Sequence, residues 1–457
     1  MNTDIFREYD IRGIADTDLT DEVAESIGKA VGTLVKRAFS NKVSPDIVVG
    51  CDNRLSSPRL FNALKKGILS TGVSIIFIGE VTTPMLYYSV NKLKAEGGIS
   101  VTASHNPPEY NGFKVLVGQE AIFGEQIQEI KNLIEKKDFE KGEGEYAEMN
   151  IEKQYTQDIA SRISLGRKLR VVADAGNGMA SDFAPAILEK IGCEVIPLYC
   201  KKDPVFPNHP ADPVKEENMC DLIATVKKEK ADLGFGFDGD SDRIGLVDEK
   251  GNLIYGDIIL ALLSQDLLTR HPGAKIIFEV KCSQALGDWI TAKGGEPIMW
   301  KTGHSLIKAK MRDEGALLAG EMSGHMFFAE NWFGVDDAIL AAAKIAEIVS
   351  KSGETLSELV SKIPDYSSSP EYRVDFADAE KFAFVEKAKK HFSEKYKTIT
   401  IDGVRVVFEN GWGLIRASNT GPKLILRFEG KSKKDLENIK KIMISEIESF
   451  SGKKFEL

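Results

Sequence analysis

The chain has 457 residues, of which 42% are hydrophobic and 28% are charged, and its formal net charge is -9. These proportions are typical of a soluble globular protein, and at roughly 100–200 residues per domain the length suggests three or four domains. A nucleic-acid-binding protein normally carries a basic face, so the acidic balance argues against a nucleic-acid partner, although local Lys and Arg side chains can still bind a small phosphorylated ligand.

The five cysteines are scattered and form no C-x-x-C pair. This spacing fits reduced thiols better than a disulfide framework or a zinc site. Residues 1–19 are charged and lack the apolar core of a signal peptide, and no run reaches the roughly 18 apolar residues of a membrane span. We therefore expect a cytoplasmic protein with no membrane partner.

Three segments of the chain repeat one plan, in which a short β-branched run is followed by a polar turn, a helical stretch ending at glycine, and a second strand. They are residues 46–79, 169–199 and 274–300. Short apolar runs between turn residues are typical of buried parallel strands, and the periodic stretches between them are typical of crossover helices. The repeat predicts an α/β fold with three similar mixed α/β domains in tandem. We place them at residues 1–150, 151–254 and 255–366.

Each copy continues through a further helical segment into a strand that runs into a polar loop. The three loops contain TASHNP (102–107), DGDSDR (238–243) and GEMSGH (320–325). Ligands of open α/β sheets bind beyond the carboxyl ends of the strands. We therefore expect the three loops to converge on one central active-site cleft.

Residues 367–457 depart from this plan. A helical stretch is followed by residues 400–430, which alternate like antiparallel strands, and by a closing helix rich in Lys and Glu. This order predicts a smaller C-terminal α+β domain. The serine- and proline-containing stretch at 367–370 predicts the linker to it.

The loop DGDSDR gives the clearest metal signal in the chain. In an extended loop alternate side chains share one side, so Asp238, Asp240 and Asp242 would present three oxygen donors to one hard cation such as Mg²⁺. Gly239 would let the backbone turn tightly. The alternative is a solvated acidic turn, although three close carboxylates repel one another without a cation.

Two other protein classes share parts of this loop. An EF-hand would use Glu249 at its twelfth position, but Arg243 stands at the sixth, where the sharp turn needs glycine. Phosphatases of the haloacid-dehalogenase type carry D-x-D-x-[TV], but the fifth position here is Asp242. Both classes therefore fit the loop poorly.

Two further loops carry side chains of the kinds that bind sugar phosphates. In the loop GLIRASNTGPK a guanidinium, hydroxyls, an amide and backbone N–H groups would form a phosphate cradle. Its polar side chains are Arg416, Ser418, Asn419 and Thr420. In GEMSGH, Glu321, Ser323 and His325 lie between glycines, and a carboxylate and a hydroxyl there suit sugar hydroxyls. Each loop is also compatible with an ordinary turn.

Ser104 stands directly beside His105, an arrangement that invites comparison with serine hydrolases. Hydrolases carry the serine in a G-x-S-x-G turn, but the neighbours here are Ala103 and His105. Adjacent residues of an extended segment point to opposite sides. We therefore expect His105 to orient the loop rather than to deprotonate Ser104.

Four motifs occur in order along the chain, namely TASHNP, DGDSDR, GEMSGH and RASNTGP. Together with FREYDIRG near the start, they closely resemble the α-D-phosphohexomutase superfamily over essentially the whole chain. GEMSGH resembles the version found in bacterial phosphomannomutase/phosphoglucomutase, whereas relatives that act on glucosamine phosphate typically carry glutamine in place of Met322. Ser241 is often glycine in relatives, but its position supplies no carboxylate.

The resemblance implies a reversible conversion of hexose 1-phosphate to hexose 6-phosphate, with mannose and glucose phosphates as substrates. Ser104 would be carried as a phosphoserine that donates its phosphoryl group to the sugar. The product of that step, a hexose 1,6-bisphosphate, would reorient in the cleft and also serve as activator. One Mg²⁺ per chain would be held by Asp238, Asp240, Asp242 and a phosphoserine oxygen of Ser104.

The resemblance also assigns roles to the remaining candidates. Arg243 would reach the transferred phosphoryl group, and Tyr9 and Lys281 would contact the substrate. The non-reacting phosphate would be held by Arg416, Ser418, Asn419 and Thr420, and the sugar hydroxyls by Glu321 and Ser323. The candidates for proton transfer are Arg12, Lys114, His304 and His325. Lys114 is the first choice, if burial and cationic neighbours lower its pKa, and a purely electrostatic phosphate contact is the alternative for Lys114 and His304.

Three alternatives to this dual mutase remain open on the sequence. They are a phosphoglucosamine mutase of the same class, a sugar-phosphate phosphatase, and a sugar-phosphate sensor without catalysis. For the mutase we expect a hinge near residues 366–370 that opens the C-terminal domain, so that the intermediate reorients or leaves. A monomer is the favoured oligomeric state.

Overall fold

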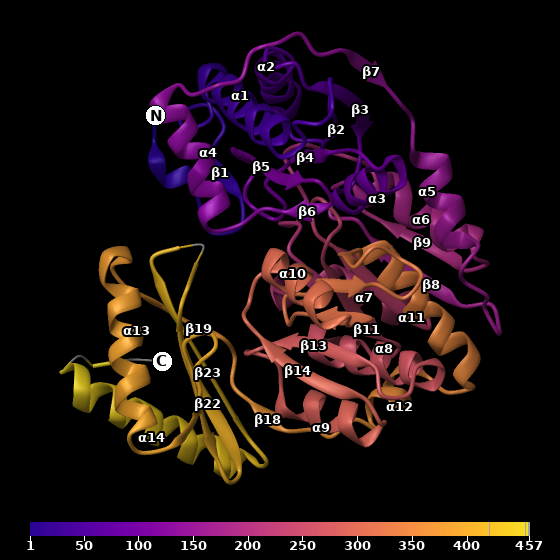
Figure 1. Cartoon of the computed structure of the whole chain (residues 1–457). Coiled ribbons are helices and arrows are strands. Elements are labelled where there is room, and N and C mark those ends of the chain that lie inside the picture. Colours follow the sequence, from indigo (N-terminus) through magenta and orange to yellow (C-terminus); the bar gives the residue numbers. More distant parts are fainter. Residues whose placement is uncertain (420, 453, 456–457) are drawn as a thin grey trace.

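The computed structural model describes residues 1–419, 421–452 and 454–455. Four β-sheets follow one another along the chain, each with its own helices (Figure 1). We call them the first to fourth units, after the sheets that contain β4 (Gly97–Val101), β10 (Leu233–Phe237), β15 (Leu318–Gly320) and β22 (Gly411–Ala417). No helix in the described part of the chain is long and apolar enough to cross a membrane.

The first unit is a mixed sheet in the order β1-β5-β4-β2-β3-β7, with β6 paired to β5. Its strands are β1 (Ile11–Ile14), β2 (Asp46–Cys51), β3 (Ser74–Glu80), β4, β5 (Tyr110–Val117), β6 (Glu120–Ala121) and β7 (Tyr146–Glu148). Its helices are α1 (Asp21–Ala38), α2 (Ser57–Leu69), α3 (Thr83–Leu93) and α4 (Glu125–Lys136), and α5 (Glu152–Ala160) follows β7.

The second and third units are smaller five-stranded sheets. The second contains β8 (Arg170–Asp174), α6 (Ala180–Lys190), β9 (Glu194–Leu198), α7 (Cys220–Glu229), β10, β11 (Ile244–Asp248) and β12 (Leu253–Ile254). The third contains α8 (Gly256–Arg270), β13 (Lys275–Glu279), α9 (Gln284–Ala292), β14 (Glu296–Trp300), α10 (His304–Glu314), β15, β16 (Met326–Phe328), β17 (Val335–Asp336), α11 (Ala338–Ser352) and α12 (Leu356–Val360).

The first three units share one strand order, which confirms the repeat and the α/β class predicted from the sequence. The orders are β3-β2-β4-β5, β9-β8-β10-β11 and β14-β13-β15-β16. In each unit the first three of these strands are mutually parallel and the fourth is antiparallel. The strand in the third place of each order is β4, β10 or β15, and each of these strands ends where one of the three polar loops begins. Topology alone therefore brings equivalent strand ends to equivalent places.

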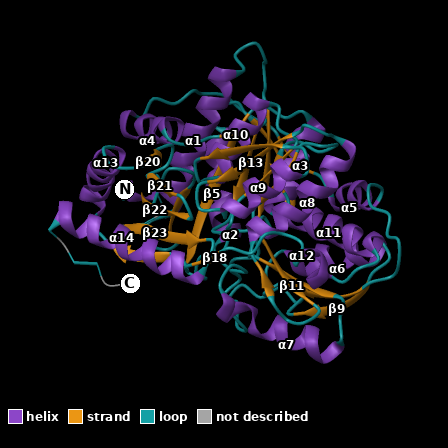
Figure 2. Ribbon diagram, turned by 90° about the horizontal axis from the view of Figure 1, so that it is seen from below, coloured by secondary structure: helices purple, strands orange, loops and turns teal. Residues whose placement is uncertain are grey.

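One hydrophobic core joins the second and third units to α3 of the first. Leu86 of α3, Ile187 of α6 and Leu340 of α11 are all fully buried members of it. The first and fourth units have further cores of their own. Seen from below, α8 and α11 lie between the strands around β13 of the third unit and those around β9 and β11 of the second (Figure 2). The shared core fixes the second and third units relative to each other, so the loops after β10 and β15 are held in a constant relation.

The fourth unit is an antiparallel sheet covered on one face by two helices, as the α+β prediction required. Its elements are β18 (Ser367–Ser368), β19 (Tyr372–Asp375), α13 (Asp378–Ser393), β20 (Lys397–Ile399), β21 (Val404–Phe408), β22, β23 (Lys423–Gly430) and α14 (Lys433–Ser451). Residues alternate between the faces of a strand. Ile415 packs with α13 and α14 in the core of this unit, whereas Trp412 and Leu414 of the same strand pack on Val280 of the third unit.

The predicted linker at 367–370 joins the third and fourth units and is itself paired with the fourth sheet. Ser367 and Ser368 pair with Gly430 and Glu429, and the Ser369 N–H donates to the Phe428 carbonyl at 2.9 Å. Small polar residues suit such a short edge strand. A hinge near residues 366–370 remains a prediction.

Candidate active site

Ser104 lies in the loop after β4, and its backbone is in the left-handed region with a φ of 51°. The Ser104 Oγ donates a hydrogen bond to Asp238 Oδ2 at 2.6 Å, and its N–H donates to Thr102 Oγ1 at 2.9 Å. The side chain is buried. The nucleophile predicted in the first unit therefore meets the acidic loop of the second.

The expected separation of Ser104 from His105 is wrong. The His105 Nδ1 lies 3.1 Å from Ser104 Oγ. In an extended segment the two side chains would point to opposite sides, but the positive φ of Ser104 turns both of them to one side. Burial, followed by the charges of Arg243 and Arg12, lowers the pKa of His105 well below its usual value, so the ring is neutral.

The acidic loop is a tight turn around Asp238. The N–H groups of Asp242 and Arg243 donate to Asp238 Oδ1 at 3.0 and 3.1 Å, and Ser241 has a φ of 64°. The three carboxylates gather as predicted, with ligand atoms within 4.8 Å of one another, but through this turn and not through extended alternation. Glu249, the last EF-hand position, instead accepts a hydrogen bond from the Ser357 N–H at 3.2 Å.

Gly239 is required by a close approach rather than by an unusual φ. A Cβ at this position would lie 2.4 Å from the Ser104 carbonyl oxygen. The backbones of the nucleophile loop and the acidic loop are therefore in direct contact. Thr83, the first residue of α3, adds a second link because its Oγ1 donates to Asp240 Oδ2 at 2.7 Å.

The donor set of the acidic loop fits a hard divalent cation. Among the described residues Asp240 Oδ1 has no hydrogen-bond partner, and Asp242 Oδ1 has only the His325 ring nitrogen nearby, at 3.2 Å, although both oxygens are fully buried. Burial, followed by the charges of Asp242 and Asp240, raises the pKa of Asp238 well above its usual value. Buried carboxylates with unsatisfied oxygens and mutual repulsion are the arrangement that a bound Mg²⁺ would relieve.

Lys114 of β5 reaches into this group. Its ammonium donates to Asp240 Oδ2 at 2.7 Å and also contacts Asp242 Oδ2. Burial lowers the pKa of Lys114, but the charges of Asp240 and Asp242 outweigh it, so the pKa lies above its usual value. The prediction of a lowered pKa is therefore wrong in this arrangement, since the nearest groups are anionic.

Arg12 and His304 approach the same centre from β1 and from the start of α10. Arg12 donates to Asp10 Oδ2 at 2.6 Å and to Asn106 Oδ1, in the Ser104 loop, at 2.8 Å. The His304 Nε2 lies 3.6 Å from Asp10 Oδ1 and is buried without a hydrogen-bond partner among the described residues. Burial, followed by the charge of Lys308, lowers the pKa of His304, so the ring is neutral, with its Nε2 facing the Asp10 carboxylate.

The GEMSGH loop of the third unit supplies a hydrogen-bonded chain. His325 Nδ1 donates to Glu321 Oε2 at 2.7 Å and lies 3.1 Å from Ser323 Oγ. His325 Nε2 lies 3.2 Å from Asp242 Oδ1, and the Arg243 Nε lies 3.3 Å from the same ring nitrogen. Burial lowers the pKa of His325. The charge of Asp242 and the hydrogen bonds of His325 to Asp242 and Glu321 outweigh burial and raise this pKa to about 9.

Tyr9 ties the first unit to the third and fourth. Its hydroxyl donates to the Thr302 carbonyl at 2.6 Å and accepts from Asn419 Nδ2 at 2.5 Å. The contact is tight, because a Cβ at Gly303 would lie 2.5 Å from the Tyr9 ring. Tyr9 therefore holds the fourth unit closed against the cleft.

The predicted phosphate loop follows β22. Arg416 Nε donates to Asp402 Oδ2 at 3.0 Å, and the Ser418 N–H donates to the Lys423 carbonyl at 2.9 Å. Lys281, after β13, pairs with Glu371 at 3.1 Å. Thr420, predicted as part of this loop, lies outside the described residues.

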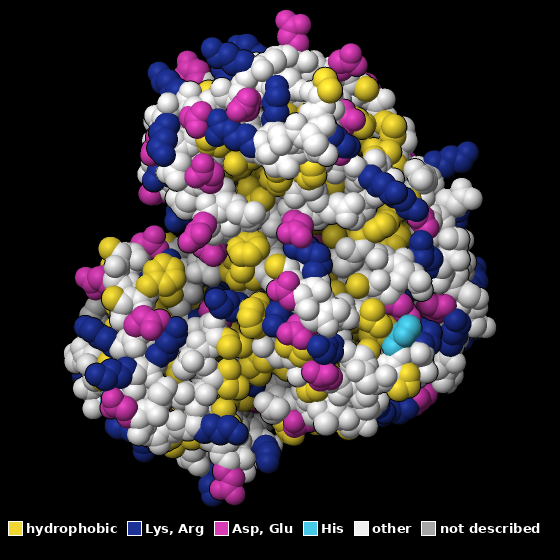
Figure 3. All heavy atoms as spheres, in the orientation of Figure 1, with side chains coloured by type: hydrophobic (Ala, Val, Ile, Leu, Met, Phe, Trp, Pro, Cys, Tyr) yellow, Lys and Arg dark blue, Asp and Glu magenta, His cyan; other side chains and the backbone are white. Residues whose placement is uncertain are grey.

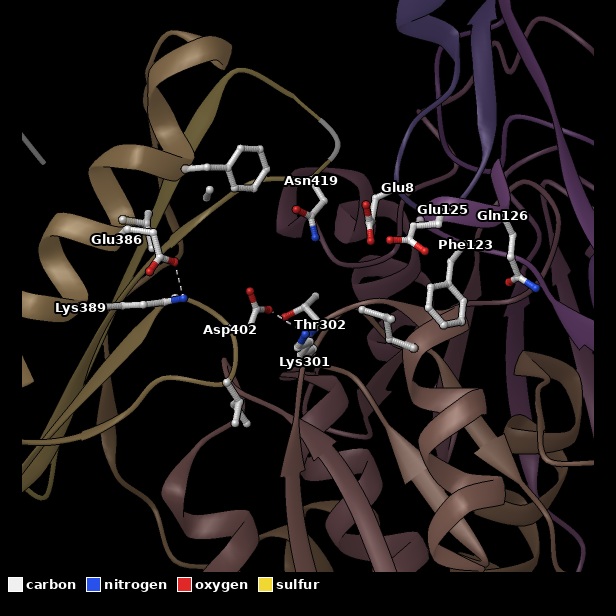
Figure 4. Close-up of a pocket in the computed structure, with 17 residues that line it drawn as sticks. Glu8, Phe123, Glu125, Gln126, Lys301, Thr302, Glu386, Lys389, Asp402 and Asn419 are labelled. Atoms are coloured by element: carbon white, nitrogen blue, oxygen red, sulfur yellow. Dashed lines mark hydrogen bonds and ion pairs between the residues drawn. The ribbon is translucent and has the colours of Figure 1, made fainter. Parts of the chain in front are cut away.

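A cavity of about 590 Å³ opens between the first, third and fourth units (Figure 4). Glu8, Lys301, Asp402 and Asn419 line it, and Asn419 is the one candidate residue among its described lining. The surface of the molecule is hollowed between the first and fourth units (Figure 3). The cavity therefore adjoins the Tyr9 contact, while Ser104 and the aspartates lie buried beyond it.

The sequence reasoning missed several buried charged residues around the site. Asp10, which accepts a hydrogen bond from Arg12, lies within the motif FREYDIRG and could have been found there. No sequence motif marks Arg54, Lys308 or Asp336. The same holds for Arg405 and Arg427, which donate to backbone carbonyls at residues 280–282 of the third unit.

Four sequence profiles of one family match the chain in order. They are described as phosphoglucomutase/phosphomannomutase alpha/beta/alpha domain I at residues 3–141, domain II at 153–251, domain III at 255–366, and the C-terminal domain at 371–446. A phosphomannomutase/phosphoglucomutase of Pseudomonas aeruginosa is 46% identical over 446 residues, covering 97% of this chain and 96% of that protein. A phosphoglucomutase of Neisseria gonorrhoeae is 44% identical over 454 residues, covering 98% of each.

A solved structure of a phosphoglucomutase/phosphomannomutase family protein from Burkholderia thailandensis has the same fold. It superposes with a TM-score of 0.92 at 39% sequence identity and covers 98% of both chains. The four profiles, the full-length relatives and this structure agree with the order of the four motifs. The chain belongs to the phosphoglucomutase/phosphomannomutase family of the α-D-phosphohexomutase superfamily, a family of enzymes.

Proposed function

We propose that this enzyme interconverts hexose 1-phosphates and hexose 6-phosphates, with glucose and mannose phosphates as substrates. The observation that carries the proposal is the meeting of the Ser104 hydroxyl with the three-aspartate loop at 2.6 Å in a buried site. A hydroxyl held there is placed to carry a phosphoryl group beside a divalent cation. The full-length relatives named phosphomannomutase/phosphoglucomutase support the choice of sugars.

The transfer step moves one phosphoryl group from phosphorylated Ser104 to the free hydroxyl of the bound hexose phosphate. The P–O bond to Ser104 Oγ breaks and a P–O bond to the sugar oxygen forms, which gives the hexose 1,6-bisphosphate. The sugar hydroxyl gives up its proton, and Ser104 Oγ, as the leaving group, takes one up. After the bisphosphate turns over in the cleft, Ser104 accepts the phosphoryl group from the other end, so the bisphosphate is both intermediate and activator.

Asp238, Asp240 and Asp242, with a phosphoserine oxygen of Ser104, would hold one Mg²⁺, which would supply charge neutralisation for the transferring phosphoryl group. Lys114 places a fixed positive charge beside the same point, and the guanidinium charge of Arg243 interacts with Asp238 and Asp242. Phosphoryl transfer is catalysed mainly by positioning and electrostatics, so these fixed charges are the main contribution of the chain itself.

His304 is the residue that we propose for accepting the sugar proton. It is buried, and its lowered pKa keeps the ring neutral, with Nε2 3.6 Å from Asp10 Oδ1, whereas Lys114 is held as an ammonium by two carboxylates. A general base needs a free lone pair near the reacting proton. Lys114 remains the alternative, in which a bound cation competes for Asp240 and Asp242 and releases the amine.

The far end of the substrate would be held by the third and fourth units. Arg416, Ser418 and Asn419, with Thr420 of the same loop and Lys281, would grip the non-reacting phosphate. Glu321 and Ser323 would accept and donate hydrogen bonds to sugar hydroxyls in either orientation. Tyr9 would close the cleft by its bond to Asn419.

Phosphorus NMR tests the proposal. The protein is incubated with Mg²⁺, a trace of glucose 1,6-bisphosphate and, in separate tubes, glucose 1-phosphate, mannose 1-phosphate or glucosamine 1-phosphate. Formation of 6-phosphates from glucose and mannose, with little from the amino sugar, is the expected result. Preferred conversion of the amino sugar would indicate a phosphoglucosamine mutase, release of inorganic phosphate alone a phosphatase, and no reaction in any tube a sensor.

A further inference from the structure

Arg54 is a buried arginine whose guanidinium is surrounded by the backbone of the nucleophile loop. It follows β2, and its side chain is 0% exposed. It donates to four carbonyl oxygens, at 2.9 Å to Ser104, 2.6 Å to Asn106, 2.6 Å to Pro107 and 3.1 Å to Tyr110. One side chain therefore supplies hydrogen-bond donors to four backbone carbonyls of the segment 104–110.

The carbonyls of Ser104, Asn106 and Pro107 lie outside the strands and helices, and Tyr110 is the first residue of β5. Buried backbone oxygens without partners cost free energy, and a loop normally avoids this by lying at the surface. The planar guanidinium has five donors in a fixed fork, so it spans acceptors that a flexible ammonium cannot hold at once. Arg54 thus fixes the loop, and with it the left-handed backbone of Ser104.

The guanidinium is itself held from two sides. Its Nε donates to Asp52 Oδ2 at 3.0 Å, and Asp52 Oδ1 accepts from the Ser57 hydroxyl at 2.5 Å. The ring of Phe206, from the second unit, covers the guanidinium at 5.2 Å. The same unit contributes Gly239, whose backbone touches the Ser104 carbonyl region. Arg54 therefore stands where the first and second units meet behind the nucleophile.

We propose that Arg54 is a positioning residue for Ser104, an inference that rests on the proposed function. Its guanidinium holds the Ser104 carbonyl and the three carbonyls beyond it, and so aims Ser104 Oγ at the acidic loop. Arg54 bonds the backbone of the loop and not the Ser104 hydroxyl, so it aids phosphoryl transfer without taking part in it. Most of the proposed substrate contacts lie in the third and fourth units, and none of them is made by Arg54.

The variant Arg54→Lys keeps the charge and removes the fork. We expect kcat for glucose 1-phosphate to fall by roughly 10²-fold while KM changes by less than about threefold, because the nucleophile is misplaced and the substrate contacts are intact. Hydrogen exchange in the full-length protein should become faster in peptides covering residues 102–112. The matched control is Arg59→Lys, since Arg59 of α2 also donates to backbone carbonyls, at 2.7 Å to Ala15 and 3.3 Å to Leu19, away from Ser104.

A second variant guards against misfolding of Arg54→Lys. Phe206 is partly exposed in a loop, so Phe206→Ala should fold while exposing the guanidinium to water. We expect its kcat to fall by about threefold to tenfold, again with little change in KM, as the loss of one cation–π contact implies.

Two results for Arg54→Lys would overturn the inference. They are an unchanged kcat, whether or not the loop exchanges faster, and a change in KM alone. A wild-type protein without mutase activity would refute the proposed function itself, and this separates the two failures. An Arg59→Lys enzyme with the same loss as Arg54→Lys would also count against a specific role of Arg54.

Discussion

Lys114→Met would leave the buried carboxylates of Asp240 and Asp242 without their only lysine partner among the described residues. Lys114 is 5% exposed and both aspartates are fully buried. Removing one partner of a buried ion pair typically costs about 3–5 kcal/mol. We expect the lower end, about 3 kcal/mol, because the raised pKa of Asp238 lets the loop take up a proton.

The expected result depends on Mg²⁺. For a cooperative unit of roughly 150–250 residues, a loss of about 3 kcal/mol lowers the midpoint of thermal unfolding by about 6–12 °C. Without Mg²⁺, Lys114→Met should show this loss. With Mg²⁺ the variant should recover most of this lost stability. Its unfolding midpoint should rise more than that of the wild type, because Lys114 no longer competes with the cation for Asp240 and Asp242.

Differential scanning calorimetry in EDTA and in Mg²⁺ measures both effects. Lys381→Met is the control, since Lys381 of α13 is also buried and pairs with Asp378 at 2.5 Å in the fourth unit, away from the acidic loop. It should lose stability about equally in both buffers. Two results would contradict the expectation: Lys114→Met unfolding at the wild-type temperature in EDTA, or Mg²⁺ raising the midpoint of Lys381→Met as much as that of Lys114→Met.

Two further predictions concern closure and pH. Tyr9→Phe removes the hydrogen bonds to Thr302 and Asn419. It should raise KM for glucose 1-phosphate by about fivefold to tenfold, with a smaller effect on kcat. An unchanged KM in steady-state assays would argue against closure through Tyr9. Burial raises the pKa of Asp337 from 3.8 to about 7, so wild-type stability from this group is complete below pH 3.8 and is lost as the pH rises through 7. Asp337→Asn has no carboxyl group to titrate, so its urea midpoint should rise relative to that of the wild type between about pH 4 and 7. A difference between the two midpoints that stays constant with pH would contradict the raised pKa.

The architecture was predictable from the sequence because it depends on short-range patterns. Alternating strands and helices, repeated three times, fix the order of pairing, and the carboxyl ends of equivalent strands then lie at equivalent places. Each motif at such an end, such as Ser104 after β4 or Asp238 after β10, could be placed without knowledge of its partners.

Local backbone conformation could not be predicted, because distant parts of the chain impose it. The left-handed φ of Ser104 is held by Arg54 from another loop and faces Asp238 from another unit. An extended segment was the reasonable expectation, and it led to the wrong placement of His105 and to the wrong reason for the grouping of the aspartates. The linker at 367–370 was predicted from its composition, but the pairing of Ser367 and Ser368 with β23 was not.

The charges of the site also depend on residues far apart in the sequence. Lys114 and its partner Asp240 are separated by 126 positions, and Tyr9 and Asn419 by 410. A lysine surrounded by cations would have a lowered pKa, but the fold surrounds Lys114 with carboxylates. The sequence motifs predicted residues such as Ser104 and Asp238 that the fold brings together, whereas their protonation states follow from the folded arrangement alone.

The most direct test of the central claim is intact-protein mass spectrometry of the wild type and of Ser104→Ala. Each is incubated with Mg²⁺ and glucose 1,6-bisphosphate and then with glucose 6-phosphate. The wild type should gain one phosphoryl group and transfer it to the sugar as bisphosphate, while Ser104→Ala should gain none. Labelling of Ser104→Ala, or loss of the group from the wild type as inorganic phosphate only, would contradict a phosphoserine mutase.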